Sequence, residues 1–415
     1  MQRAKQIYQN NKNIFHNLSY MTILKVFMLI LPLISYSYLI RVVGSENFGL
    51  VVYSLSIIAF FRIFVKFGFE MSAVKNVAEN SEDKDKLSVI VSSILTIQLC
   101  FYLVGFLILY ILIQSFTQFE ENQKLLYYGY LLPLCDILFL VWFFQGIEKM
   151  KYITIINVIA GLIGLAMIFV FIQEKEDYIF IPLLQAFSLL IGSLYSIWLV
   201  FKKEGIVLQI PSKENILFYF KESSPFFISR SSVVFNRETS NILLANFVSM
   251  SAVAYFDLAK KIIEAFKIPN SIIDSVIYPR IAKTKNKVLV KKVFLIKIFS
   301  SLILFSIVYL FGKYFILFLG GTEMNDTYDI LKLFSLMIIL TAMSYYLGAS
   351  VLVSFGYSNK FNLSVIYGTG LYLIFTIVLY YTNNITINNI IILLLIIESY
   401  IFIYRYYYSK KYKIL

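Results

Sequence analysis

Several basic residues lie inside long apolar stretches of the sequence, where a charged side chain is costly. At the centre of a membrane helix each one costs at least about 2.5–3.5 kcal/mol, so such residues usually face a water-filled cavity or one another. They are Lys25, Arg62, Lys66, Arg230, Arg237, Lys260, Lys261 and Lys267. Arginine binds a phosphate group through two parallel hydrogen bonds, and lysine adds a compact positive charge. The group therefore predicts a binding site for an anion within a membrane.

Helical spacing places some of these cations on shared faces. Arg230 and Arg237 are seven residues apart, and Arg62 and Lys66 are four apart, so each pair lies on one side of a helix. Arg237 falls near the middle of its apolar stretch. Its neighbour Glu238 is expected to point elsewhere, because adjacent helical residues do not face each other. Arg237 is therefore predicted to need a partner from another helix or a ligand.

Three carboxylates in the apolar stretches are candidates for binding a coupling H⁺ or Na⁺, namely Asp257, Glu264 and Glu398. A structural role is an equal alternative, because Asp257 can pair with Lys261, and Lys260 with Glu264, one helical turn away. The sequence contains no Walker motif or glycine-rich phosphate loop. If the predicted site moves its anion across the membrane, the energy is therefore expected from H⁺, Na⁺, the membrane potential or the gradient of the anion itself.

Metal and catalytic chemistry find little support in the sequence. The chain has one histidine, His16, and two cysteines, Cys100 and Cys135, which are too few ligands for a metal site. Both cysteines lie in apolar stretches and are expected to serve packing. No cluster of acid and base residues stands out. We therefore expect neither an enzyme nor a metal or organic cofactor.

The elements that must position these residues are membrane-spanning helices. Of the 415 residues, 59% are hydrophobic and only 15% are charged, whereas soluble domains are about 45–50% apolar and 25% charged. This composition excludes a soluble enzyme, a secreted disulfide scaffold and a nucleic-acid-binding domain, despite the net charge of +13. Unbroken apolar runs favour helices over barrel strands, which alternate polar and apolar residues. Twelve spans are predicted at 18–40, 48–69, 87–113, 125–146, 152–172, 178–201, 222–246, 251–278, 293–318, 327–355, 361–381 and 386–407.

The distribution of lysine and arginine over the loops predicts the orientation. With a cytoplasmic N-terminus, 24 of the 37 cations fall on the inner side, including Lys297 and Arg405, against five on the outer side. Both termini are then cytoplasmic. The 202–221 loop divides the chain into two six-helix bundles, 1–205 and 206–415, which are expected to have the same orientation and to enclose the substrate site between them.

Several short motifs resemble the O-antigen and polysaccharide flippase family (Wzx-type). The most specific is the run WFFQGIEKM at 142–150, followed by Tyr152 and Ile153. Shorter similarities occur at 44–49, 67–73, 223–230, 254–261 and 278–280. They correspond to the turn between helices 1 and 2, the end of helix 2, the start of helix 7, and both ends of helix 8.

The resemblance implies a multidrug/oligosaccharidyl-lipid/polysaccharide exporter fold, with two six-helix bundles forming a V around a cationic cavity. It implies an undecaprenyl-pyrophosphate-linked oligosaccharide as substrate, flipped from the inner to the outer leaflet of the bacterial inner membrane. A polysaccharide polymerase and a chain-length regulator are the expected partners, together with membrane lipids and without nucleic acid. By helix position, the cavity cations of the family correspond to Lys25, Arg62, Arg230, Arg237 and Lys260.

Three alternatives are distinguished by sequence features. A lipid II flippase shares the charge pattern, but such proteins often carry two further helices. A drug or cation antiporter of the same superfamily should have an acidic cavity, whereas here the basic residues outnumber the acidic ones. A membrane glycosyltransferase or polymerase would need large external loops or an acid–base cluster. We therefore expect a flippase for polysaccharide assembly.

Overall fold

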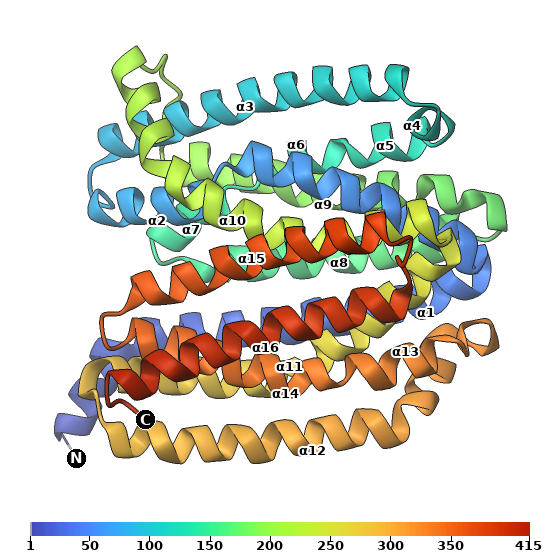
Figure 1. The fold of residues 1–415 in the computed structure, drawn as a ribbon. Helices are drawn as coiled ribbons and strands as arrows, with labels where there is room; N and C mark the ends of the chain where they lie inside the picture. The colour runs from blue at the N-terminus through green and yellow to red at the C-terminus, as the bar shows by residue number, and fades with distance from the viewer. Residues whose placement is uncertain (1) are drawn as a thin grey trace. The chain divides into compact units, whose positions relative to one another are not determined.

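The computed structural model describes the backbone of residues 2–415, and the side chains of residue 27 and of residues 31–415 apart from 275, 276 and 279. Across this part of the chain every regular element is a helix and none is a strand (Figure 1). The α-helices are α1 (Gln2–Lys66), α2 (Phe69–Glu79), α3 (Lys84–Ser115), α4 (Thr117–Glu121), α5 (Gln123–Gly129), α6 (Leu131–Leu138), α7 (Val141–Gly146), α8 (Met150–Phe171), α9 (Ile181–Trp198), α10 (Lys213–Phe247), α11 (Met250–Thr284), α12 (Lys287–Gly320), α13 (Thr327–Phe334), α14 (Leu336–Tyr345), α15 (Ser358–Tyr381) and α16 (Ile387–Lys411). Two 3₁₀ segments, η1 (Lys175–Phe180) and η3 (Thr322–Met324), and two π-helical segments, η2 (Leu199–Lys203) and η4 (Tyr346–Val353), join them.

Each of the twelve predicted spans lies mainly on helical backbone, although the 125–146 span is interrupted at Tyr130 and at Phe139 and Leu140. Two of them lie in α1, which is interrupted at Gly44, where the backbone has a φ of 80°. Nine helices of the described chain are long and apolar enough to cross a membrane. The number is nine because the continuous stretch Leu31–Glu79 counts once, and because α10 and α11, which carry several embedded charges, are not among them. The predicted all-α, multi-pass membrane fold is therefore confirmed.

Polar side chains cap several helices at their N-termini. Asp83 accepts a hydrogen bond from the Lys86 amide at 3.1 Å at the start of α3, and this bond lowers the pKa of Asp83. The side chain of Asn286 accepts hydrogen bonds from the amides of Val288 and Leu289 at the start of α12. These caps satisfy amides that have no partner within the helix, and they fix where each helix begins.

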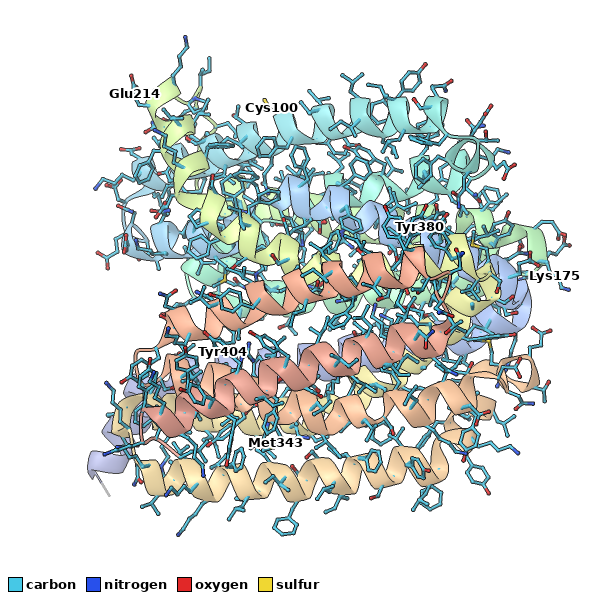
Figure 2. All side chains as sticks on the ribbon, viewed as in Figure 1. Cys100, Lys175, Glu214, Met343, Tyr380 and Tyr404 are labelled. Atoms are coloured by element: carbon cyan, nitrogen blue, oxygen red, sulfur yellow. The ribbon has the colours of Figure 1, made fainter. Side chains whose placement is uncertain are left out.

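The chain divides into two compact units that do not follow the chain order. Unit 1 comprises residues 1–43 and 54–234, and unit 2 comprises residues 44–53 and 235–415. The short segment around the break in α1 thus belongs to unit 2, and most of α10 belongs to unit 1. In Figure 2 the labelled residues Glu214 and Lys175 lie at opposite ends of unit 1. The bundle limits 1–205 and 206–415 stay a prediction.

The motif at 142–150 forms part of the core of unit 1. Trp142, Phe143 and Phe144 are buried in α7, in a cluster that also contains Phe69 and Val77 of α2. Gly146 lies so close to α2 that a Cβ there would approach the Val77 side chain to 2.5 Å. The aromatic residues and the glycine of this motif therefore serve the packing of α7 against α2.

Candidate functional site

Arg62 and Lys66 of α1 lie in a cluster of opposite charges in unit 1. Arg62 binds Asp136 of α6 through two hydrogen bonds, from Nε to Oδ2 at 2.6 Å and from Nη2 to Oδ1 at 2.9 Å. Lys66 lies 3.4 Å from Oδ1 of Asp136 and 2.8 Å from Oε1 of Glu70. Two cations and two carboxylates thus gather at the end of α1. The Arg62 side chain is still 36% exposed, whereas that of Asp136 is 13% exposed.

Arg230 lies in the part of α10 that belongs to unit 1, and its side chain is exposed. Its Nη2 atom contacts the thioether sulfur of Met71 at 3.5 Å. A thioether is a weak acceptor, so this contact does not neutralise the guanidinium. Arg230 is therefore available to an anionic partner.

Arg237 and Lys260 are brought together in unit 2. Arg237 Nε lies 2.9 Å from Oε1 of Glu238, so the prediction that Glu238 points away from Arg237 is wrong. Both side chains are long enough to meet along the helix surface, and Glu238 is the more buried, with 12% exposure against 51% for Arg237. The Lys260 ammonium donates to the backbone carbonyl of Arg237 at 3.3 Å, which ties α11 to α10.

The candidate coupling carboxylates have different surroundings. Glu264 pairs with Lys261 at 3.9 Å, whereas helical spacing predicted Lys260 as its partner. Asp257 is buried in α11. Glu398 of α16 accepts a hydrogen bond from the Ser344 hydroxyl. Glu398 is thus in contact with α14.

Two cations that were counted with the cytoplasmic loops are instead buried in helices inside unit 2, which corrects their placement in loops. Lys297 of α12 is fully buried and lies 2.6 Å from Asp274 of α11. Arg405 of α16 is also buried, and it donates to the Ser364 hydroxyl at 2.9 Å and to the Ser344 carbonyl at 2.8 Å. Both cations therefore join helices within the unit. Lys25 is the remaining predicted site residue, and its side chain lies outside the described residues.

Two close helix contacts use the motifs at 44–49, 67–73 and 223–230. The first, the α2–α10 contact, lies in unit 1. It comprises the buried Ser72 and Ser223 hydroxyls, 2.7 Å apart, and a hydrogen bond of 2.6 Å from Asn76 to Glu222. Gly68 precedes α2 with a φ of 78°, and a Cβ there would lie 2.7 Å from the Phe227 amide nitrogen. Glycine is therefore required at this position both by conformation and by space.

The second, the α1–α11 contact, lies in unit 2. A Cβ on Gly49 would overlap with the carbonyl oxygen of Met250. The Ser45 hydroxyl lies 3.4 Å from that of Ser251 nearby. These motif residues thus let one backbone approach another closely. The resemblance gave their places along the helices but not the pairs that they form.

Comparisons with known proteins agree with this fold and with these motifs. A family model described as "Polysaccharide biosynthesis protein" matches residues 14–285. Two relatives are named "Putative O-antigen transporter". The relative from Escherichia coli (strain K12) is 24% identical over 360 residues, covering 85% of this chain and 86% of the relative. The relative from Shigella dysenteriae is 26% identical over 260 residues, covering 61% of this chain and 63% of the relative.

Solved structures with a similar fold include a drug transporter and a lipid flippase. An inward-facing multidrug resistance MATE family transporter of the MOP superfamily has a TM-score of 0.72 at 14% identity, covering 95% of this chain and 99% of that one. The lipid II flippase MurJ in an inward closed conformation has a TM-score of 0.71 at 14% identity, covering 94% of this chain and 87% of that one. These similarities concern the fold. Because the family model spans more than half of the sequence, the chain belongs to the polysaccharide biosynthesis protein family.

Proposed function

We propose that this protein is a flippase for undecaprenyl-pyrophosphate-linked oligosaccharides. It would move them from the inner to the outer leaflet of the bacterial inner membrane for O-antigen or polysaccharide assembly, with both of its termini in the cytoplasm. Family membership and the names of the two relatives support a transporter of such glycans. A polymerase and a chain-length regulator would act on the product. The chain itself would carry out no covalent step.

The observation that carries the proposal is the Arg62–Asp136 pair. A carboxylate and a phosphate present two oxygens to guanidinium in the same planar, bidentate manner. Asp136 therefore holds the fork of Arg62 in the arrangement that a pyrophosphate oxygen pair needs. Since Arg62 is also partly exposed, a pyrophosphate would take the place of the carboxylate, and Asp136 would keep Lys66, 3.4 Å away, as its cation. Further positive charge would come from Arg230, Arg237 and Lys260. We propose the same role for Lys25.

The transport cycle would use the two close helix contacts. Opening the α2–α10 contact would admit the glycan at the inner side, and opening the α1–α11 contact would release it at the outer side. H⁺, Na⁺ and the membrane potential remain the alternative energy sources. Among Asp257, Glu264 and Glu398, we favour Glu398 as the coupling group, because its hydrogen bond with Ser344 joins α16 to α14.

The test is surface polysaccharide in cells that lack their own flippase. Arg62→Ala and Arg237→Ala are each expected to abolish most of it, Arg62→Lys to retain part, and Lys124→Ala, on an exposed residue of α5, to leave it unchanged. Normal polysaccharide with both alanine variants would refute the assignment of these cations to substrate binding.

A lipid II flippase is the second candidate, since the fold resembles that of MurJ. The discriminating experiment expresses the chain in cells depleted of their lipid II flippase. Growth under depletion would favour the second candidate. Surface polysaccharide without such growth would favour the first.

A further inference from the structure

The linker between η2 and α10 is fastened to α3 by its backbone. Residues 205–212 form no regular element. The Val207 amide donates to the Ser88 hydroxyl at 3.0 Å, and the Gln209 amide donates to the Ser92 hydroxyl at 2.9 Å. Ser88 and Ser92 are one helical turn apart, so alternate amides of the linker follow the surface of α3, beside which the linker runs in Figure 1. This binding fixes the position of an otherwise irregular segment.

The side chains of the same segment are apolar and exposed. Val207 is 62% exposed, Leu208 is 60% exposed and Ile210 is 99% exposed. Leu217 and Phe218 in the first turns of α10 are more than half exposed as well. Large aliphatic groups gathered on a surface in this way are unfavourable in water and mark a site of contact with lipid or with another apolar surface.

The depth of the two serines favours lipid as the contact. α3 is a membrane-spanning candidate that begins at Lys84. With a rise of about 1.5 Å per residue, Ser92 lies about 12 Å along its axis. A segment beside it therefore reaches the boundary between head groups and acyl chains. Backbone amides at that depth need partners within the protein, and the two serine hydroxyls provide them for Val207 and Gln209.

The charges on either side of the segment indicate the kind of lipid. Lys202 and Lys203 precede it, Lys213 and Lys221 follow it, and all four are exposed. Basic residues beside an apolar segment strengthen its binding to membranes with anionic lipids. A protein partner would also cover aliphatic groups, but the positive charges of the flanking lysines are complementary to the phosphates of phospholipid head groups.

We propose that residues 207–210 insert into the lipid–water boundary, with the aliphatic side chains of Val207, Leu208 and Ile210 among acyl chains and the flanking lysines among anionic phospholipid head groups. The segment is thus a membrane-surface anchor in the linker, held against α3 by Ser88 and Ser92. By the predicted orientation it lies at the cytoplasmic leaflet. The inference depends on the membrane setting of the fold and not on the transported substrate.

The test measures the depth of the segment in the full chain. Cys100→Ser and Cys135→Ser remove the native thiols, and a nitroxide is attached at Ile210→Cys or, as control, at Lys213→Cys. In vesicles of phosphatidylcholine and phosphatidylglycerol, collisions with oxygen, which partitions into lipid, are compared with collisions with a water-soluble nickel chelate. The oxygen-to-nickel ratio at position 210 is expected to exceed that at 213 severalfold.

Four results would contradict the proposal. Equal ratios at the two positions would place residue 210 in water. Low collision rates with both reagents at 210 would mean that protein covers it. An unchanged ratio without phosphatidylglycerol would remove the anionic head groups from the proposal. Ser88→Ala with Ser92→Ala is expected to lower the ratio at 210 severalfold, because the two linker amides would then seek water, and an unchanged ratio would contradict the role of the serines.

Discussion

The hydroxyl oxygens of Ser72 and Ser223 lie 2.7 Å apart although the residues are separated by 151 positions in the sequence, and both side chains are buried. The pair joins α2 to α10 beside Gly68, where a Cβ would lie 2.9 Å from the carbonyl oxygen of Ser223. Such a close approach needs small residues on both helices. In the proposed cycle, the two helices must separate here each time the inner side opens.

A reversible crosslink at this pair should stop transport. In a chain with Cys100→Ser and Cys135→Ser, the variant Ser72→Cys with Ser223→Cys is expected to form a disulfide on oxidation, since the two side chains already meet. Surface polysaccharide should then fall to background and return when a reductant is added. Either single cysteine variant serves as control. Full transport by the quantitatively crosslinked protein would contradict the opening of this contact.

Gly49 should tolerate no side chain, whereas Gly370 should. A Cβ on Gly49 would overlap with the Met250 carbonyl oxygen, and the backbone would have to move. Gly49→Ala is therefore expected to lower the stability of unit 2 by about 1–3 kcal/mol and to reduce transport. Gly370 of α15 has open space around it, so Gly370→Ala should gain up to about 1 kcal/mol from helix propensity.

The measurement for both glycine variants is the midpoint of thermal unfolding in detergent, followed by surface polysaccharide. A Gly49→Ala protein as stable and as active as Gly370→Ala would show that the α1–α11 contact is looser than the structure has it.

The sequence predicted the helices better than the partners of the charged residues. Apolar runs are local signals, so each of the twelve predicted spans lies mainly on helical backbone, although one of them is divided among α5, α6 and α7. The pair Arg62 and Asp136 is separated by 74 positions, and no periodicity within a helix can connect residues of two helices. Asp136 was noticeable only as a carboxylate in an apolar stretch, which is a signal that it needs a cation.

Lys297 and Arg405 were assigned to the wrong environment for a related reason. Counting cations by loop assumes that a basic residue near a helix end lies in water. α12 begins at Lys287, so Lys297 is nearly three turns inside it. The apolar residues on both sides of Lys297, in the run VFLIKIF at 293–299, were the available indication. For Arg405 the indication was Glu398, seven residues earlier and on the same face of the helix.

Exchanging the charges of Arg62 and Asp136 should separate their structural role from their role in binding. Arg62→Ala and Asp136→Ala are each expected to lower stability by about 1–3 kcal/mol, since each leaves a partly buried charge without its bidentate partner. Arg62→Asp with Asp136→Arg should recover most of that loss. It should not recover transport, because the guanidinium would then extend from α6 instead of α1.

The measurements are the unfolding midpoint in detergent and the amount of surface polysaccharide. They are made for the unchanged chain, the two alanine variants and the exchanged pair. Should the exchanged pair restore polysaccharide together with stability, the pair would be structural and the pyrophosphate would be bound elsewhere.

The buried pair of Lys297 and Asp274 should behave as a structural unit. Lys297 Nζ lies 2.6 Å from Asp274 Oδ2 and also donates to the Asn270 carbonyl at 3.0 Å. Lys297→Met leaves a buried carboxylate without its cation, which costs about 3–5 kcal/mol, whereas replacing both charges by apolar groups is often neutral. Lys297→Met is therefore expected to unfold at a much lower temperature than the unchanged chain. The double variant Lys297→Met with Asp274→Leu is expected to recover most of the lost stability and most of the surface polysaccharide. If the double variant is stable but inactive, the pair takes part in transport itself, and the structural assignment fails.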